Sequence, residues 1–281
     1  MITQAFILGA GLGTRLRPLT DILPKPMVPL FHKPLAEWAL EACEAAGCQR
    51  FAINTHHLPE KWEGFGRGRD VSFFHEPVLL ETGGGIKNIE EWVEEGSLLV
   101  HNGDIFSTLD LRKLSAIHEA SGDEVTLALR SEGVARHIAL DGSRRVLDIR
   151  GMLGKALGTH VFSGIYCMRK KFLKRFPELE KISVIPFFLE LAKEGGLGAV
   201  VLDEGVWVDL GDVESYLKAH RELALQEPVH PQALIGEGAV IEQSLVGKGA
   251  VIGSNSRVVD SVVWPGAVLG EGELIRMRVL T

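Results

Sequence analysis

The stretch "ILGAGLGTRLRPLTDILPKPMVPL", residues 7–30, combines an apolar run, three alternating glycines, an Arg-x-Arg pair and a lysine between two prolines. The apolar run predicts a short buried strand that ends at a turn. Gly9, Gly11 and Gly13 let a ligand approach the backbone closely and present N–H groups to phosphate oxygens. We therefore predict a β-strand followed by a phosphate-binding loop.

The cations of this loop indicate phosphate binding more specifically than its glycines do. The spacing G-x-G-x-G is neither the dinucleotide fingerprint nor a P-loop. Arg15 offers a fork of donors to a polyphosphate, and Lys25 places a compact charge on a turn that Pro24 and Pro26 stiffen. Solvated loop cations are the alternative interpretation of Arg15, Arg17 and Lys25.

Short apolar runs alternate with amphipathic stretches through the first half of the chain. The predicted strands cover residues 5–8, 51–54, 71–75, 98–101 and 125–129. The predicted helices between them cover residues 35–46, 84–94 and 110–120. This alternation predicts an α/β fold with a mainly parallel sheet, helices on both faces, and ligands at the carboxyl ends of the strands.

The pattern changes after Asp141. Further strands are predicted over 146–149, 159–168 and 199–202, and further helices over 183–193 and 213–225. Pro228 and Pro231 then mark a linker. The sequence thus predicts two domains, residues 1–227 and 228–281.

The last segment repeats with an offset of 17 residues, because residues 235–241 are echoed by 252–258 and 269–275. Aliphatic residues spaced by six, with glycines at the turns, predict the hexapeptide coils of a parallel β-helix. An irregular loop is the alternative. So few coils leave an end of the prism to be covered, and we therefore expect a homo-oligomer that forms through the β-helix.

Composition excludes several classes of partner. The 281 residues carry a net charge of -7, which does not favour nucleic acid or an anionic membrane surface. No apolar stretch approaches the roughly 20 residues that span a bilayer, so we expect a cytoplasmic protein. The three cysteines lack a C-x-x-C pattern and are expected to be buried thiols. His56 and His57 lack the spacing of a zinc site.

Residues 11–20 and 24–29 read G-x-G-T-R-L-x-P-L-T and P-K-P-x-x-P. They resemble the signature of the sugar-1-phosphate nucleotidylyltransferases, and the resemblance extends over most of residues 1–226. It implies a Rossmann-like nucleotidyltransferase domain, often followed by a left-handed β-helix. It also implies that a nucleoside triphosphate is joined to a sugar 1-phosphate by in-line attack on the α-phosphorus, with release of pyrophosphate.

The same resemblance implies a magnesium site. Asp104 ends the segment Asn102–Asp104 after a predicted strand, and Asp209 lies within Trp207–Gly211. In the family, aspartates at these two places hold Mg²⁺, which prefers hard oxygen ligands and shares its shell with substrate phosphates. A capping or turn role is the alternative for either aspartate.

Roles for the remaining residues follow from the resemblance. Arg15 and the amides of the glycine loop would stabilise the leaving pyrophosphate, and Lys25 would bridge phosphates in the transition state. The expected nucleotide-binding residues are Leu8, Gly9, Ala10, Gly11, Gly13, Thr14, Arg15, Glu76, Thr82, Gly83, Gly84, Asn102 and Gly103.

The clues to the base disagree. Residues 80–86, LETGGGI, resemble the N-acetylmuramate 1-phosphate uridylyltransferases, which favours UTP. Glu76 stands where the family reads the base, and a carboxylate that accepts hydrogen bonds would also suit guanine. The β-helix is more similar to mannose-1-phosphate guanylyltransferases, so GTP is the alternative.

The sugar pocket is less defined. Ser163 and Gly164 match a family segment that lines it, although packing of a strand is an alternative for both. The usual Glu-Lys-Pro segment is absent, and Lys155 is only a loose substitute as anchor for the sugar phosphate. Two other functions are alternatives. One is a regulatory subunit that binds a nucleotide-sugar without turnover, and the other is an acyltransferase, which residues 235–281 disfavour because they contain no histidine.

Overall fold

The computed structural model describes residues 1–133, 135–178 and 180–281. The chain divides into two compact units, which we describe separately. The first comprises residues 1–12 and 36–207, and the second comprises residues 13–35 and 208–281. The division at residue 227 therefore stays a prediction.

A mixed sheet forms the centre of the first unit. Within the described residues it has seven strands in the order β12-β8-β11-β6-β1-β4-β5. The strands are β1 (Gln4–Leu8), β4 (Arg50–Thr55), β5 (Asp70–His75), β6 (Ser97–Asn102), β8 (Val125–Arg130), β11 (Val161–Arg169) and β12 (Leu197–Val201). Only β11 runs antiparallel to its neighbours in this sheet, so the mainly parallel sheet predicted from the sequence is confirmed.

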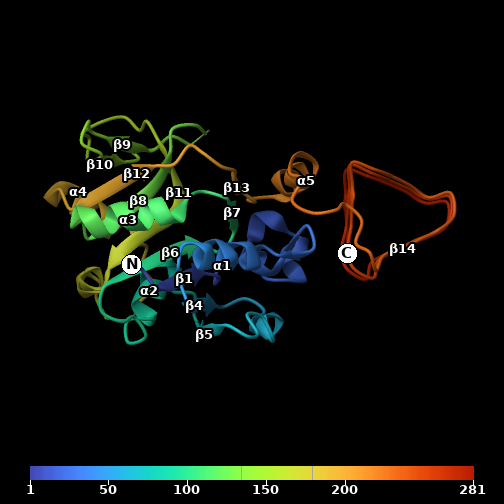
Figure 1. The fold of residues 1–281 in the computed structure, drawn as a ribbon, viewed down its shortest axis with the longest axis horizontal. Coiled ribbons are helices and arrows are strands. Elements are labelled where there is room, and N and C mark those ends of the chain that lie inside the picture. The colour runs from blue at the N-terminus through green and yellow to red at the C-terminus, as the bar shows by residue number, and fades with distance from the viewer. Residues whose placement is uncertain (134, 179) are drawn as a thin grey trace. The chain divides into compact units, whose positions relative to one another are not determined.

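Apolar side chains alternate between the two faces of this sheet. Phe6, Val100 and Tyr166 share one core cluster with Ile86 and Phe188 from the helices α2 and α4. On the other face α3 runs beside β8 and β11, as Figure 1 shows. Helices therefore cover both faces, as the alternation of strands and helices predicts.

The helices of the first unit begin close to their predicted positions, with one exception. They are α1 (Leu35–Ala45, whose first residue belongs to the second unit), α2 (Glu81–Asn88), α3 (Leu111–Ser121) and α4 (Ile185–Glu194). The predicted helix 84–94 is wrong in its bounds. The helix begins earlier, at Glu81, because Gly83 and Gly84 allow it to pack closely on residues 180–183. Turns over residues 89–93 continue the apolar period after the helix ends.

Shorter elements connect these. They are β7 (Ile105–Ser107), β9 (Ile138–Leu140), β10 (Val146–Ile149), β13 (Trp207–Asp209, whose last two residues belong to the second unit), and the 3-10 helices η4 (Pro59–Trp62) and η5 (Lys170–Arg175). β9 and β10 form an antiparallel pair outside the main sheet, so residues 146–149 do not extend that sheet.

The second unit joins the cation-bearing loop to the C-terminal segment. Its loop forms η1 (Thr14–Leu16), η2 (Leu19–Asp21), η3 (Lys25–Met27) and the hairpin of β2 (Pro29–Leu30) with β3 (Lys33–Pro34). Helix α5 (Val213–Glu222) is shorter than the predicted 213–225. A capping box of Asp212 and Ser215 fixes its start.

Three faces of stacked short strands form the C-terminal coils, whose triangular outline is visible in Figure 1. The faces are β14 (Leu234–Ile235), β17 (Val251–Ile252) and β20 (Val268–Leu269); β15 (Val240–Glu242), β18 (Arg257–Val259) and β21 (Leu274–Arg276); and β16 (Leu245–Val246), β19 (Val262–Val263) and β22 (Val279–Leu280). All their pairs are parallel, and Leu234 aligns with Val251 and then with Val268. These coils are those expected of a left-handed β-helix.

Candidate active site

A buried chain of hydrogen bonds holds the start of the glycine loop in the first unit. Asn54, at the end of β4, accepts the backbone N–H of Gly9 through Oδ1 at 2.7 Å and donates through Nδ2 to Oε1 of Glu76, also at 2.7 Å. The second carboxylate oxygen of Glu76 accepts the N–H of Leu80 at 2.9 Å. Since Glu76 is 1% exposed, its contacts favour holding the loop, and reading of the base stays a prediction. Sequence reasoning missed Asn54, although a polar residue that ends an apolar strand is a usable signal.

Gly9 and Gly11 differ in what surrounds them. A Cβ at Gly9 would lie 2.7 Å from the carbonyl oxygen of Asn54 and 3.0 Å from the ring of Trp62, whereas a Cβ at Gly11 would meet nothing within 4 Å. Leu8 is half-buried and Ala10 is buried. Gly9 is thus required by packing, and Gly11 leaves exposed backbone that a phosphate can approach.

The segment Asn102–Asp104 lies at the carboxyl end of β6. Asn102 aligns with Leu8 at the end of β1, and the N–H of Gly103 donates to the carbonyl of Leu8 at 2.9 Å. A Cβ at Gly103 would lie 2.8 Å from that carbonyl oxygen, so the two strand ends touch here. The half-buried Asp104 is the next residue. The structure therefore brings the predicted magnesium ligand of the first unit to the sheet edge that carries the glycine loop.

Thr82, Gly83 and Gly84 lie inside α2. The amides of both glycines donate to the carbonyl of Ile182 at 2.8 and 3.0 Å, and the Thr82 hydroxyl accepts the N–H of Val184 at 3.0 Å. The two glycine amides and the threonine hydroxyl therefore bind α2 to residues 182–184. Contact of these three residues with a base stays a prediction.

The second unit places the two predicted cations beside the predicted carboxylate segment. Nζ of the buried Lys25 lies 3.6 Å from Oδ1 of Asp209, whose side chain is 46% exposed. A Cβ at Gly211 would lie 3.2 Å from a terminal guanidinium nitrogen of Arg15, whose side chain is exposed. Hydrogen bonds from Ser215 hold the pKa of Asp212 below its usual range, and the charges of Arg15 and Lys25 lower this pKa further. Two loop cations and the start of α5 thus form one polar cluster.

Gly13 allows the cation loop to close on itself. Its φ of 60° is in the left-handed region, and a Cβ there would lie 2.9 Å from Cβ of Lys25. The Thr20 hydroxyl donates to the Gly13 carbonyl at 3.0 Å. Thr14 begins η1 and is exposed. Lys25 is the first residue of the 3-10 helix η3, where the sequence predicts a turn. The helix fixes the position of the Lys25 backbone and Cβ.

Ser163 and Gly164, which are predicted to line the sugar pocket, lie in different surroundings. The Ser163 hydroxyl is fully buried and donates to the carbonyl of Ala128 at 2.8 Å, so it does not face solvent. Gly164, at φ 76°, packs against Asn102, to whose side-chain nitrogen a Cβ would lie 2.8 Å. The indole of Trp207 donates to the Ser163 carbonyl at 2.8 Å, a contact that sequence reasoning missed.

Lys155 lies in a loop that a buried aspartate organises. Asp148 accepts the N–H groups of Leu153 and Lys155, at 3.0 and 2.9 Å. These bonds lower the pKa of Asp148 although its burial opposes them. The Lys155 side chain is exposed, and its contact with a sugar phosphate stays a prediction.

Carboxylates such as those of Asp104 and Asp209 suit hard cations, Mg²⁺ among them, and the binding of a metal by these two residues stays a prediction. Among the residues that the structure describes, no three histidine, cysteine or acidic side chains form a metal cluster. Mg²⁺ is usually bound by one or two carboxylates together with waters and substrate phosphates, so it needs no larger protein cluster. Asp104 belongs to the first unit and Asp209 to the second.

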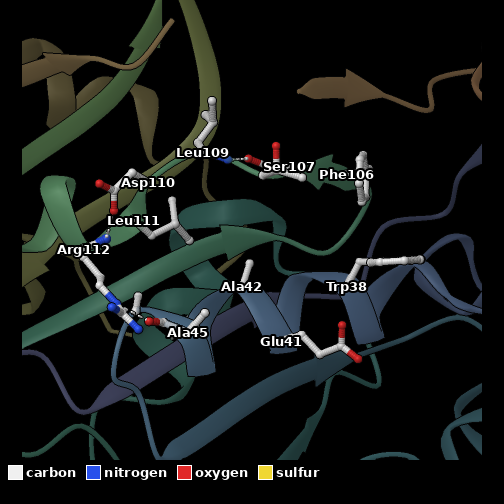
Figure 2. A pocket seen from close by; sticks show the side chains of 12 residues that line it. Trp38, Glu41, Ala42, Ala45, Phe106, Ser107, Leu109, Asp110, Leu111 and Arg112 are labelled. Atoms are coloured by element: carbon white, nitrogen blue, oxygen red, sulfur yellow. Dashed lines mark hydrogen bonds between the residues drawn. The ribbon is translucent and has the colours of Figure 1, made fainter. Parts of the chain in front are cut away.

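A separate cavity of about 470 Å³ lies in the first unit, between α1, the end of β7 and the start of α3. Figure 2 shows Trp38, Glu41 and Phe106 on its wall, and Arg112, whose guanidinium donates to the carbonyl of Ala45. The residues that line it include none of the predicted site residues. This cavity is therefore not the predicted nucleotide site.

Comparisons with known proteins bear on these residues. The chain is 28% identical to the mannose-1-phosphate guanylyltransferase of Mycobacterium tuberculosis, over 97% of this chain and 82% of that protein. It is also 28% identical to the N-acetylmuramate alpha-1-phosphate uridylyltransferase of Caulobacter vibrioides, over 78% and 96% of the two chains. The crystal structure of HddC from Yersinia pseudotuberculosis matches with a TM-score of 0.63 at 27% identity, over 78% of this chain and 98% of that one.

The described helices include none that is both long and apolar enough to span a membrane. The family described as "Nucleotidyl transferase" matches residues 4–226, the segment that carries the glycine loop, Lys25, Asp104 and Asp209. This match covers more than half of the chain. The chain belongs to the nucleotidyl transferase family.

Proposed function

We propose that this protein is a sugar-1-phosphate nucleotidylyltransferase that uses UTP. The observation that carries the proposal is the ion pair between Lys25 and Asp209, with Arg15 beside Gly211. A buried lysine, an exposed arginine and a carboxylate suit the binding of a triphosphate and its counter-ion. The relatives named above use sugar 1-phosphates by their names, and they include both a uridylyltransferase and a guanylyltransferase.

In this reaction an oxygen of the sugar phosphate attacks the α-phosphorus in line, and pyrophosphate leaves. The nucleophile is already an anion, so positioning and charge neutralisation carry catalysis and no strong general base is required. Arg15 and the exposed amides near Gly11 neutralise the leaving pyrophosphate, and Lys25 neutralises charge that develops between the reactants. Asp104 and Asp209 are proposed to hold Mg²⁺, which supplies further positive charge to the phosphates when bound.

UTP is proposed on the likeness of residues 80–86 to the uridylyltransferases, and the contacts of Glu76 agree with it. Glu76 is 1% exposed and its two carboxylate oxygens accept bonds from Asn54 and Leu80, which favours a role in holding the loop over the reading of guanine donors. GTP is the second candidate, because the match with the mannose-1-phosphate guanylyltransferase spans nearly the whole chain, β-helix included.

Turnover with a panel of substrates tests the proposal. The purified chain is assayed for pyrophosphate with UTP, GTP, dTTP, CTP or ATP, each with Mg²⁺ and a set of sugar 1-phosphates, and UTP is expected to give the highest kcat/KM. The matched control is the D104N variant, which should release no pyrophosphate. Thermal stabilisation by a nucleotide-sugar without turnover of any pair would instead indicate a regulatory subunit.

A further inference from the structure

Helix α5 holds both partners of the Lys25–Asp209 ion pair. Asp209 lies three positions before the capping residue Asp212, so the start of the helix sets its place. Lys25 lies four positions before Pro29, whose carbonyl accepts the hydroxyl of Tyr216 at 2.6 Å. One helix therefore constrains the ion pair from both sides.

Tyr216 also contacts the β-helix. The indole Nε1 of Trp264, at the turn after β19, donates to the Tyr216 hydroxyl oxygen at 3.0 Å. Tyr216 is fully buried and Trp264 is 5% exposed, so water does not compete for these bonds. Burial raises the pKa of Tyr216, and the hydroxyl therefore keeps the proton that it donates to Pro29. Trp264, Tyr216 and the carbonyl of Pro29 thus form a continuous chain of hydrogen bonds, which we call the relay. It runs from the β-helix to the loop that carries Lys25.

A second contact fixes the same loop on α5. The N–H of Phe31 donates to Nε2 of His220 at 3.0 Å, and the two rings stack with centroids 5.2 Å apart. Nδ1 of His220 lies 2.9 Å from the Tyr216 carbonyl, so it carries the proton and leaves Nε2 as an acceptor. Burial lowers the pKa of His220 to about 4, which keeps the ring neutral in this role. The residue after β2 is thereby held against α5.

The segment from Lys25 to Pro29 is rigid, so a displacement at one end is passed to the other end. The N–H of Val28 donates to the carbonyl of Lys25 at 3.1 Å. The N–H of Leu35 donates to the carbonyl of Val28, also at 3.1 Å. Pro26 and Pro29 restrict the backbone on either side of Val28. A shift of the Pro29 carbonyl therefore moves the start of η3, and with it the lysine.

We propose that Tyr216 and Trp264 are positioning residues for Lys25, through which the β-helix takes part in the reaction. This inference rests on the proposed function for its kinetic consequence. Its structural consequence, a loop over residues 25–30 that is ordered by the relay, does not depend on any substrate. The two consequences can be measured separately.

The kinetic test compares Y216F with Y166F. Tyr166 is the matched control because it is equally buried and its hydroxyl has no partner among the described residues. At a temperature where both variants are folded by circular dichroism, Y216F should lower kcat by roughly tenfold to a hundredfold, the scale of a catalytic group displaced by about 1 Å. KM for both substrates should stay within about threefold, because the lysine acts mainly in the transition state.

A double-mutant cycle separates positioning from general damage. If Tyr216 acts through Lys25, Y216F should change kcat less than about twofold in the K25A background. An equal loss of kcat in both backgrounds, or an unchanged kcat in Y216F alone, would overturn the inference. W264F, which removes only the first donor of the relay, repeats the comparison if Y216F does not fold.

Hydrogen exchange tests the same inference without turnover. The peptide that spans residues 25–30 should exchange faster in Y216F and in W264F than in the wild type, and it should be unchanged in Y166F. An unchanged exchange rate in both relay variants would refute the positioning role whether or not the protein turns over UTP. Faster exchange without any wild-type turnover would refute the proposed function and leave the relay standing.

Discussion

The ammonium group of Lys25 lies 3.6 Å from the carboxylate of Asp209, residues that are far apart in sequence but share one compact unit. The lysine is buried and the aspartate is half exposed, so the pair is open to a ligand from the aspartate side. Removal of the carboxylate alone would therefore take a charged partner away from a buried lysine, which is destabilising.

Substitution of Lys25 by alanine should lower kcat by roughly a hundredfold to a thousandfold, the scale seen when one preorganised electrostatic donor is removed. KM should change much less, because Lys25 is expected to act on charge that develops in the transition state. Pyrophosphate release under saturating UTP measures the effect. R17A is the control, since Arg17 is exposed and pairs with Asp21. Wild-type kcat in K25A would remove the lysine from the mechanism.

Removal of either proposed magnesium ligand should abolish metal-dependent turnover. D104N and D209N keep the size of the side chain and lose the charge that a hard cation prefers. EDTA should inactivate the wild type, and Mg²⁺ should restore it. D110N is a suitable control, because Asp110 caps α3 and is not a predicted ligand. If both variants responded to Mg²⁺ like the wild type, neither carboxylate would be a ligand.

The two glycines after β1 should respond differently to alanine. G9A forces a Cβ to 2.7 Å from a backbone oxygen and should destabilise the fold by roughly 1–3 kcal/mol. G11A should leave the free energy of unfolding unchanged, since a Cβ there meets nothing within 4 Å. It should weaken nucleotide binding about tenfold, or ~1.4 kcal/mol, by blocking approach to the loop. Urea unfolding and calorimetric titration with UTP measure the two effects, and equal destabilisation would contradict this division.

Substitution of Glu76 is expected to lower the free energy of unfolding more than it changes the selection of the base. In E76Q the amide nitrogen cannot accept the hydrogen bond that one carboxylate oxygen now accepts from Asn54 or Leu80. An unpaired buried donor costs about 1–3 kcal/mol, which urea unfolding would show. The ratio of kcat/KM for UTP and GTP should change little. A changed ratio at wild-type stability would instead show that Glu76 reads the base.

Acid should destabilise the fold through buried histidines. Burial lowers the pKa of His118 from 6.5 to about 4, so between these values the unfolded chain binds more protons than the folded one. The stabilisation is therefore complete above pH 6.5 and is lost as the pH falls toward 4. H118Q should flatten the dependence of unfolding free energy on pH in this window, and H75Q, at an exposed histidine, should not. Parallel curves for H118Q and the wild type would contradict the assignment.

Local patterns in the sequence predicted the strands, the repeat of the β-helix and the segments that carry the cluster. Apolar runs identify strands because burial on both faces leaves no polar alternation. The predicted bounds of α2 are wrong because Gly83 and Gly84 let the helix pack on residues 180–183, which lie far along the chain. The same limit applies to the site: the buried contacts of Asn54, Glu76 and Ser163 depend on tertiary neighbours that no local spacing reveals.

The indole of Trp264 has a consequence for how such chains can evolve. Appended coils are often regarded as modules that recombination can exchange freely between enzymes. Here the Trp264 side chain of the coils donates a hydrogen bond to Tyr216 of helix α5, outside the coils. A chimaera with foreign coils should keep its activity only if the donor supplies an equivalent N–H at this corner, so the coils and the residue at position 216 are expected to be inherited together.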